Sequence, residues 1–116
     1  ITTIGAHLPS DNADSSSLFY SLHVDHALTE KLYGLVEVNG LHYIDDGSRL
    51  AVPFEGGDLL NLGSANAEGN YLLTMAFGGT YKFNTNWETA AAYEIPLAAK
   101  GDIFDDRLTY TLSFVY

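Results

Sequence analysis

The chain has 116 residues, of which 47% are hydrophobic and 17% are charged, and its formal net charge at pH 7 is −10. The length is that of one small domain, and the charged fraction lies below the ~25% that is typical of soluble domains. The acidic balance excludes the basic surface that binds nucleic acid, and the absence of cysteine excludes disulfides and thiolate metal sites.

The hydrophobic pattern alternates with a period of two and predicts six antiparallel strands and no helix. In chain order, the predicted strands cover residues 1–8, 17–28, 31–44, 70–83, 87–97 and 107–116. The pattern is weakest in the first strand. It is mixed in the third, where Tyr33 and Leu35 share a face with Glu37 and Asn39. We therefore expect an all-β, up-and-down antiparallel barrel, with residues 1–116 forming a single domain or the C-terminal part of one.

The links between the predicted strands alternate between short and long. Residues 29–30 and 84–86 are typical of tight hairpin turns. Residues 9–16, 45–69 and 98–106 are longer and rich in Asp, Gly, Ser and Asn, which predicts loops. Because short and long links alternate, we expect all the long loops at one end of the sheet and both turns at the other.

The longest loop contains one apolar patch, residues 52–63. A structureless loop of this length is uncommon in a compact domain unless it is functional. Three interpretations are open. The patch folds into the mouth of a barrel as a constriction, with Phe54, Leu59 and Leu60 as anchors; it binds a partner subunit; or it packs over the rim.

Charged residues avoid one face of the predicted strands. Twelve of the 20 charged residues lie in the three long loops, and two lie at a tight turn. The other six lie on the less apolar face: Asp25, Glu37, Lys82, Glu88, Glu94 and Arg107. A charge on the lipid-facing side of a membrane barrel costs roughly 2–4 kcal/mol at the bilayer midplane. A soluble β-sandwich also excludes charge from its inner face, so this pattern alone does not decide between the two.

Strand length and aromatic placement favour a transmembrane barrel. The clearest predicted strands have 10–14 residues, a length that crosses a bilayer at a tilt of ~45°. No run approaches the ~18 apolar residues of a membrane helix. Tyr81, Phe83 and Trp87 lie near a tight turn, where membrane-interface aromatics belong. The opposite faces hold Thr, Ala, Gly and Ser among the charged residues, which suits a polar lumen.

The last strand, RLTYTLSFVY, resembles the C-terminal β-signal of bacterial outer-membrane β-barrel proteins. The resemblance implies that one row of this strand is recognised by the barrel-assembly machinery and that the strand closes the barrel against the first. That row is Tyr110, Leu112, Phe114 and Tyr116. Residues 61–97 are similar to the terminal hairpins of larger, transporter-like barrels. The resemblance covers residues 60–116 well and residues 1–59 in pattern only. The family's orientation implies an outer-membrane location, a periplasmic C-terminus, periplasmic tight turns and extracellular long loops.

The number of predicted strands departs from that family, because single-chain bacterial barrels start at eight strands. Either the chain is the C-terminal part of a longer barrel, which we favour, or several chains close one barrel together. The chain begins with Ile1 and shows no signal peptide, so we expect a processed or excised product. The expected partners are outer-membrane lipid, the assembly machinery and the remaining strands of the barrel, from the same or other chains.

The predicted lumen row allows two interpretations. Its members are His23, Asp25, Glu37, Lys82, Glu88, Glu94 and Arg107. A net acidic lining favours cations over anions, as rings of acidic side chains do in pores. Alternatively, these side chains pair with one another and fill a narrow barrel.

The sequence predicts neither catalysis nor a cofactor. Ser21, His23 and Asp25 share one strand face, but i, i+2 spacing leaves neighbours ~7 Å apart, too far for a catalytic set. The acidic loops carry oxygen ligands that suit Ca²⁺, but none matches the EF-hand loop, so no metal site is predicted.

The preferred interpretation is an outer-membrane β-barrel, or its C-terminal part, that acts as a passive pore or structural membrane component with an acidic lumen. One alternative is a soluble β-barrel that binds a small apolar ligand, with the Tyr, Leu and Phe rows pointing inward. Another is a structural subunit that packs against other chains in an assembly.

Overall fold

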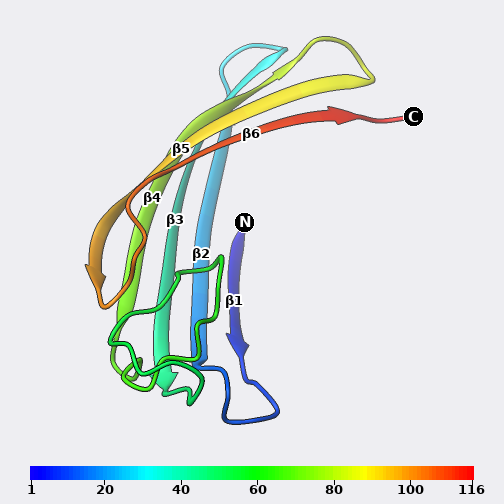
Figure 1. Cartoon of the computed structure of the whole chain (residues 1–116). Coiled ribbons are helices and arrows are strands. Elements are labelled where there is room, and N and C mark those ends of the chain that lie inside the picture. The colour runs from blue at the N-terminus through cyan, green and yellow to red at the C-terminus, as the bar shows by residue number, and fades with distance from the viewer.

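The computed structural model describes residues 1–116 as one six-stranded antiparallel sheet (Figure 1). The strands are β1 (Thr2–His7), β2 (Ser16–Ala27), β3 (Leu32–Asp45), β4 (Tyr71–Lys82), β5 (Trp87–Lys100) and β6 (Arg107–Phe114). Neighbours in the sheet follow chain order, so the topology is an up-and-down meander. The predicted all-β, antiparallel, six-stranded organisation is confirmed. The structure contains no helix long and apolar enough to cross a membrane.

The sheet is curved but open. β1 pairs only with β2 and β6 pairs only with β5, so both outer strands leave one edge unpaired. The expected closed barrel is therefore not formed by this chain alone. Six strands are fewer than the eight with which single-chain barrels start, and the concave side of the sheet holds the long loop between β3 and β4 (Figure 1).

The strand register places the charged residues in a row on one face of the sheet, which we call the inner face. His23 lies opposite Glu37, Glu37 opposite Ala76, Ala76 opposite Glu94, and Glu94 opposite Arg107. This row crosses five strands without interruption. The long loop lies over the same face, so the inner face is the concave one (Figure 1).

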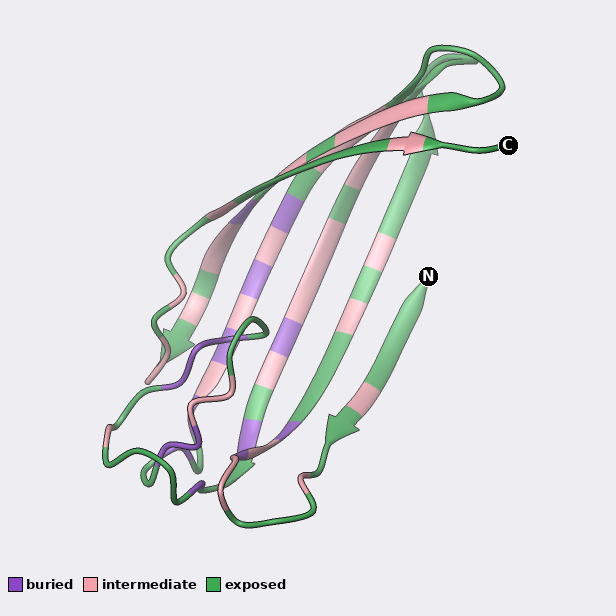
Figure 2. Ribbon diagram, turned by 45° about the vertical axis from the view of Figure 1, so that its right-hand side comes forward, coloured by how far each residue is buried: buried purple, intermediate pink, exposed green.

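The other, outer face is apolar and uncovered. One row across it consists of Val24, Val36, Phe77, Tyr93 and Leu108. Each of these side chains lies between 39% and 75% exposed. Only four hydrophobic residues of the chain are buried (Tyr43, Ala67, Leu72 and Ala76), and Figure 2 shows the buried positions confined to the middle strands and the long-loop end. The sheet therefore has no apolar core of its own.

A bulge interrupts the pairing of β4 with β5. Leu73 lies opposite Ala98 but Thr74 lies opposite Pro96, so Leu97 has no partner. Proline has no N–H to donate to a ladder and is found at such bulges. β5 continues past the bulge to Lys100, three residues beyond the predicted end of this strand.

Candidate functional site

A hydrogen-bonded network of polar side chains crosses the middle of the inner face. His23 Nδ1 lies 2.8 Å from Glu37 Oε2. The amide of Asn39 donates to Glu37 Oε1 at 2.9 Å and to Glu94 Oε1 at 3.3 Å. The network thus joins β2, β3 and β5 through side chains that the register places in adjacent rows.

Glu94 is the centre of this network. Its side chain is only 8% exposed, and an isolated buried carboxylate is costly unless it is paired and hydrogen-bonded. Thr74 Oγ1 donates to it at 2.5 Å, and Arg107 donates through Nε at 2.9 Å and through Nη2 at 2.5 Å. The buried charge is therefore both neutralised and fully hydrogen-bonded.

The structure thus brings four of the seven predicted lumen residues into one network, in which Asn39 links the two pairs. The four are His23, Glu37, Glu94 and Arg107. The other three lie on the same face but outside the network. Asp25 Oδ1 lies 3.9 Å from His23 Nε2 and is largely exposed. Lys82 Nζ lies 4.5 Å above the Tyr33 ring, and Glu88 is opposite Lys82 in the register. No group of three or more His, Asp or Glu side chains is placed to hold a metal ion.

The long loops form one folded cap at their end of the sheet, organised by the fully buried Glu55. Ser15 Oγ donates to the Glu55 carboxylate at 2.5 Å, and the amides of Leu62 and Ser64 donate at 2.8 and 2.7 Å. The Glu55 backbone also bonds the third loop, since its N–H donates to Gly101 O and its carbonyl accepts from Ile103. One residue therefore ties all three loops together.

A second carboxylate of the cap, the half-buried Asp102, fixes the cap to the sheet. It accepts hydrogen bonds from the amides of Gly57 at 3.0 Å and Phe104 at 2.9 Å, and Tyr43 Oη of β3 lies 3.3 Å away. Burial raises the pKa of the Asp102 carboxyl above its usual value of 3.8, while the hydrogen bonds from these amides act in the opposite direction.

Asp58 connects the long loop to the network on the inner face. Both of its carboxylate oxygens lie 3.0 Å from Arg107 Nη1. The apolar side chains that one of the three interpretations treats as anchors, Phe54, Leu59 and Leu60, are 38%, 66% and 59% exposed. Polar contacts hold the loop.

Sequence reasoning missed Glu55, Asp58 and Asp102 as structural residues. The only local signal is the motif EGGD (residues 55–58), in which two acids flank two glycines. Gly57 has a positive φ of 62°, and this motif predicts a tight turn but not its partners.

The residues expected at the membrane interface lie together at the tight-turn end. The rings of Tyr81 and Phe83 are 5.2 Å apart, and those of Trp87 and Phe114 are 4.8 Å apart. In β6, the predicted signal row points outward along the unpaired edge, and Tyr116 lies beyond the end of the strand. These aromatics are exposed: Tyr81, Phe83, Trp87, Tyr110, Phe114 and Tyr116.

Comparisons with known proteins give no assignment: no family model, no curated protein and no solved structure matches the chain.

Proposed function

We propose that the chain forms part of the wall of a bacterial outer-membrane β-barrel, as a passive pore or structural membrane component with an acidic lumen. The observation that supports this most is the polarity of the sheet, whose concave face is charged and whose convex face is apolar and exposed. Outer-membrane barrels have this arrangement, with an apolar band facing lipid and a polar interior. In water, exposed apolar surface costs about 25 cal/mol per Å² relative to burial, and lipid removes that cost.

Strand dimensions agree with this proposal. β2 to β5 have 12 or 14 residues. At a rise of about 3.3 Å per residue and a tilt of about 45°, such strands cover roughly 30 Å along the membrane normal. That is the thickness of the hydrocarbon core. The aromatic pairs at the tight-turn end would then lie at the periplasmic interface and the folded cap outside the cell.

The open edges of the sheet fit a wall that other strands complete. Unpaired backbone groups are not tolerated in lipid, so β1 and β6 require partner strands from the same protein or from other chains. The outer strands β1 and β6 run in opposite directions, because the meander has an even number of strands. A further antiparallel strand can pair with the free edge of either one. Lipid, the remaining strands and the assembly machinery are therefore the proposed partners.

The inner face supports a preference for cations. The seven lumen residues include four carboxylates but only one Lys and one Arg. Arg107 is engaged by Glu94 and Asp58, so Lys82, opposite Glu88, is the only other Lys or Arg of this row against Asp25, Glu37 and Glu88. A soluble carrier barrel requires the Tyr, Leu and Phe rows to face an enclosed interior, and their position on the convex face argues against it.

The test is extraction of the protein from its native envelope, followed by gel electrophoresis. We expect the protein to stay with the membrane through a urea wash, to dissolve in detergent, and to run as a compact band that shifts on boiling. A boiled band at the mass of the 116-residue chain would mean that several chains share one barrel, and a larger band that the chain is part of a longer protein. Release by urea without any shift on boiling would reject the membrane proposal.

A further inference from the structure

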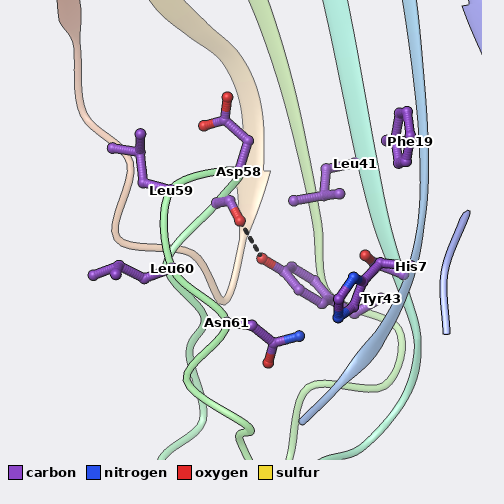
Figure 3. A pocket seen from close by; sticks show the side chains of 10 residues that line it. His7, Phe19, Leu41, Tyr43, Asp58, Leu59, Leu60 and Asn61 are labelled. Carbon is purple, nitrogen blue, oxygen red and sulfur yellow. Dashed lines mark hydrogen bonds between the residues drawn. The ribbon is translucent and has the colours of Figure 1, made fainter. Parts of the chain in front are cut away.

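A groove lies between the turn at residues 57–61 of the long loop and the inner face of β1 to β3 (Figure 3). Its main hollow has a volume of about 390 Å³. A second hollow of about 200 Å³ shares Phe19, Leu41 and Asp58 with the first and extends to Glu94. A combined space of this size is in the range of small-molecule sites.

The floor of the groove is an apolar patch on an otherwise polar face. Phe19 and Leu41 are opposite one another in β2 and β3, and Leu72 continues the row in β4. The Phe19 ring rests on Gly5 of β1, where an added Cβ would come within 2.3 Å of the ring. Even so, Phe19 is 41% exposed, so the floor is accessible apolar surface beneath the loop.

The wall of the groove is acidic. Asp58 belongs to the main hollow and Glu94 to the second one. The one guanidinium between them, that of Arg107, leaves the trio with one negative charge in excess. The Asp58 side chain is 56% exposed, so its carboxylate can accept a further donor while it remains paired with Arg107.

We propose that this groove binds a small organic cation, namely an amine with one aromatic or branched apolar group. The apolar group lies on Phe19 and Leu41, and the ammonium donates to Asp58. The acidic wall repels anions. An uncharged analogue of the same shape lacks the charge-assisted hydrogen bond to Asp58, which is roughly twice as strong as a neutral hydrogen bond. This proposal rests on the proposed function only in that the inner face is a lumen that solutes can enter.

The test is an NMR titration of the isotope-labelled full chain in detergent with phenethylammonium, phenethyl alcohol and phenylacetate. We expect phenethylammonium to shift the resonances of Phe19 and Leu41 and to bind about tenfold more tightly than phenethyl alcohol. We expect phenylacetate not to bind. Asp58→Asn should remove most of the preference for the amine over the alcohol, and Asp58→Glu should retain it. Phe19→Ala should weaken both ligands together.

Glu88→Gln is the matched control, because Glu88 is an inner-face acid outside both hollows. It should leave the ratio of the two affinities unchanged, and this ratio does not depend on the fraction of protein that is folded. Equal affinity for amine and alcohol would overturn the proposal, as would shifts confined to the outer-face aromatics. A protein that passes the boiling assay but does not bind rejects the groove alone. A protein that binds but is released by urea rejects the membrane barrel alone.

Discussion

Arg107 Nη1 lies 3.0 Å from both carboxylate oxygens of Asp58, while Nε and Nη2 of the same guanidinium bond Glu94. One side chain on β6 therefore joins the long loop to the neighbouring strand β5. The two acids differ in exposure, since the Glu94 side chain is 8% exposed and that of Asp58 is 56% exposed. The two halves of this bridge should therefore contribute unequally to stability.

Arg107→Gln should be much more destabilising than Asp58→Asn. Loss of Arg107 leaves the Glu94 carboxylate buried without a cation, which typically costs about 3–5 kcal/mol. Loss of the Asp58 charge removes only a solvent-exposed pair, worth about 0–1 kcal/mol. The measurement is the free energy of unfolding from denaturant titrations of the two variants in the same detergent. Equal losses would show that the burial of Glu94 does not govern this bridge.

Glu55→Gln should loosen all three long loops at once. The substitution puts an amide NH₂ where one carboxylate oxygen now accepts a hydrogen bond, and a buried unsatisfied donor costs about 1–3 kcal/mol. Limited proteolysis should therefore cut the loops roughly 5- to 150-fold faster than in the unsubstituted protein. Glu68→Gln, at an exposed position of the same loop, is the control and should change the cleavage rate little. Faster cleavage in one loop only would contradict the role of Glu55 in joining them.

Asp102 should make the cap less stable as the pH rises. Its pKa in the folded protein is raised by burial above the usual 3.8. Between the unfolded and folded pKa values the folded state binds more protons, so the free energy of unfolding falls as the pH passes upward through that window. Asp102→Asn removes this contribution. Denaturation midpoints measured over a pH series should show a steeper decline with rising pH for the unsubstituted protein, whereas parallel curves would refute the assignment.

The sheet was predictable from the sequence because its signal is local. Alternation along each strand predicts which residues share a face. In the mixed third strand it places Glu37 on the same face as Tyr33 and Leu35, and all three lie on the inner face of β3. The cap was not predictable for the opposite reason. Ser15 and Glu55 are 40 residues apart, and Tyr43 and Asp102 are 59 apart. Contacts over such separations leave no periodicity in the sequence.

Barrel closure was likewise beyond the sequence pattern. Alternation indicates which face of the sheet is apolar. It does not indicate how many strands close the barrel, because each strand pairs only with its neighbours. Nor did the sequence pattern show how the long loop is held, which is by hydrogen bonds to Glu55 and Asp102 and by the pairing of Asp58.

Two glycines in the long loop should respond differently to alanine. Gly63 and Gly69 have φ values of 64° and 75°, so alanine at either position incurs the left-handed penalty of about 1–2 kcal/mol. At Gly63 the added Cβ would also come within 2.0 Å of the backbone oxygen of Ala13, whereas at Gly69 the nearest atom is 4.0 Å away. Gly63→Ala should thus be clearly more destabilising in denaturant titrations. Equal effects would mean that the first loop moves aside without cost.

Leu22 and Ser21 are neighbours in the middle of β2 that point to opposite faces, and this makes them a direct test of which face meets lipid. The register places Ser21 opposite Asn39 on the inner face and Leu22 opposite Val38 on the outer face. A charge on the lipid face near the midplane costs roughly 2–4 kcal/mol for Arg or Lys and somewhat less for Asp. In a membrane, Leu22→Asp should therefore be clearly destabilising, and Ser21→Asp should cost far less because it enters a polar lumen.

In water the same pair of substitutions should behave alike, since Leu22 is already 50% exposed and surface substitutions usually change stability by about 0.5 kcal/mol or less. The measurement is the fraction of each variant that shows the compact, unboiled band after extraction from the envelope. A loss for Leu22→Asp alone would favour lipid on the outer face. β6 and its terminal aromatic row are untouched in both variants, so a defect in assembly recognition would not explain the difference. Equal recovery of the two variants would mean that the outer face does not meet lipid, and that its apolar rows are covered by protein or remain in water.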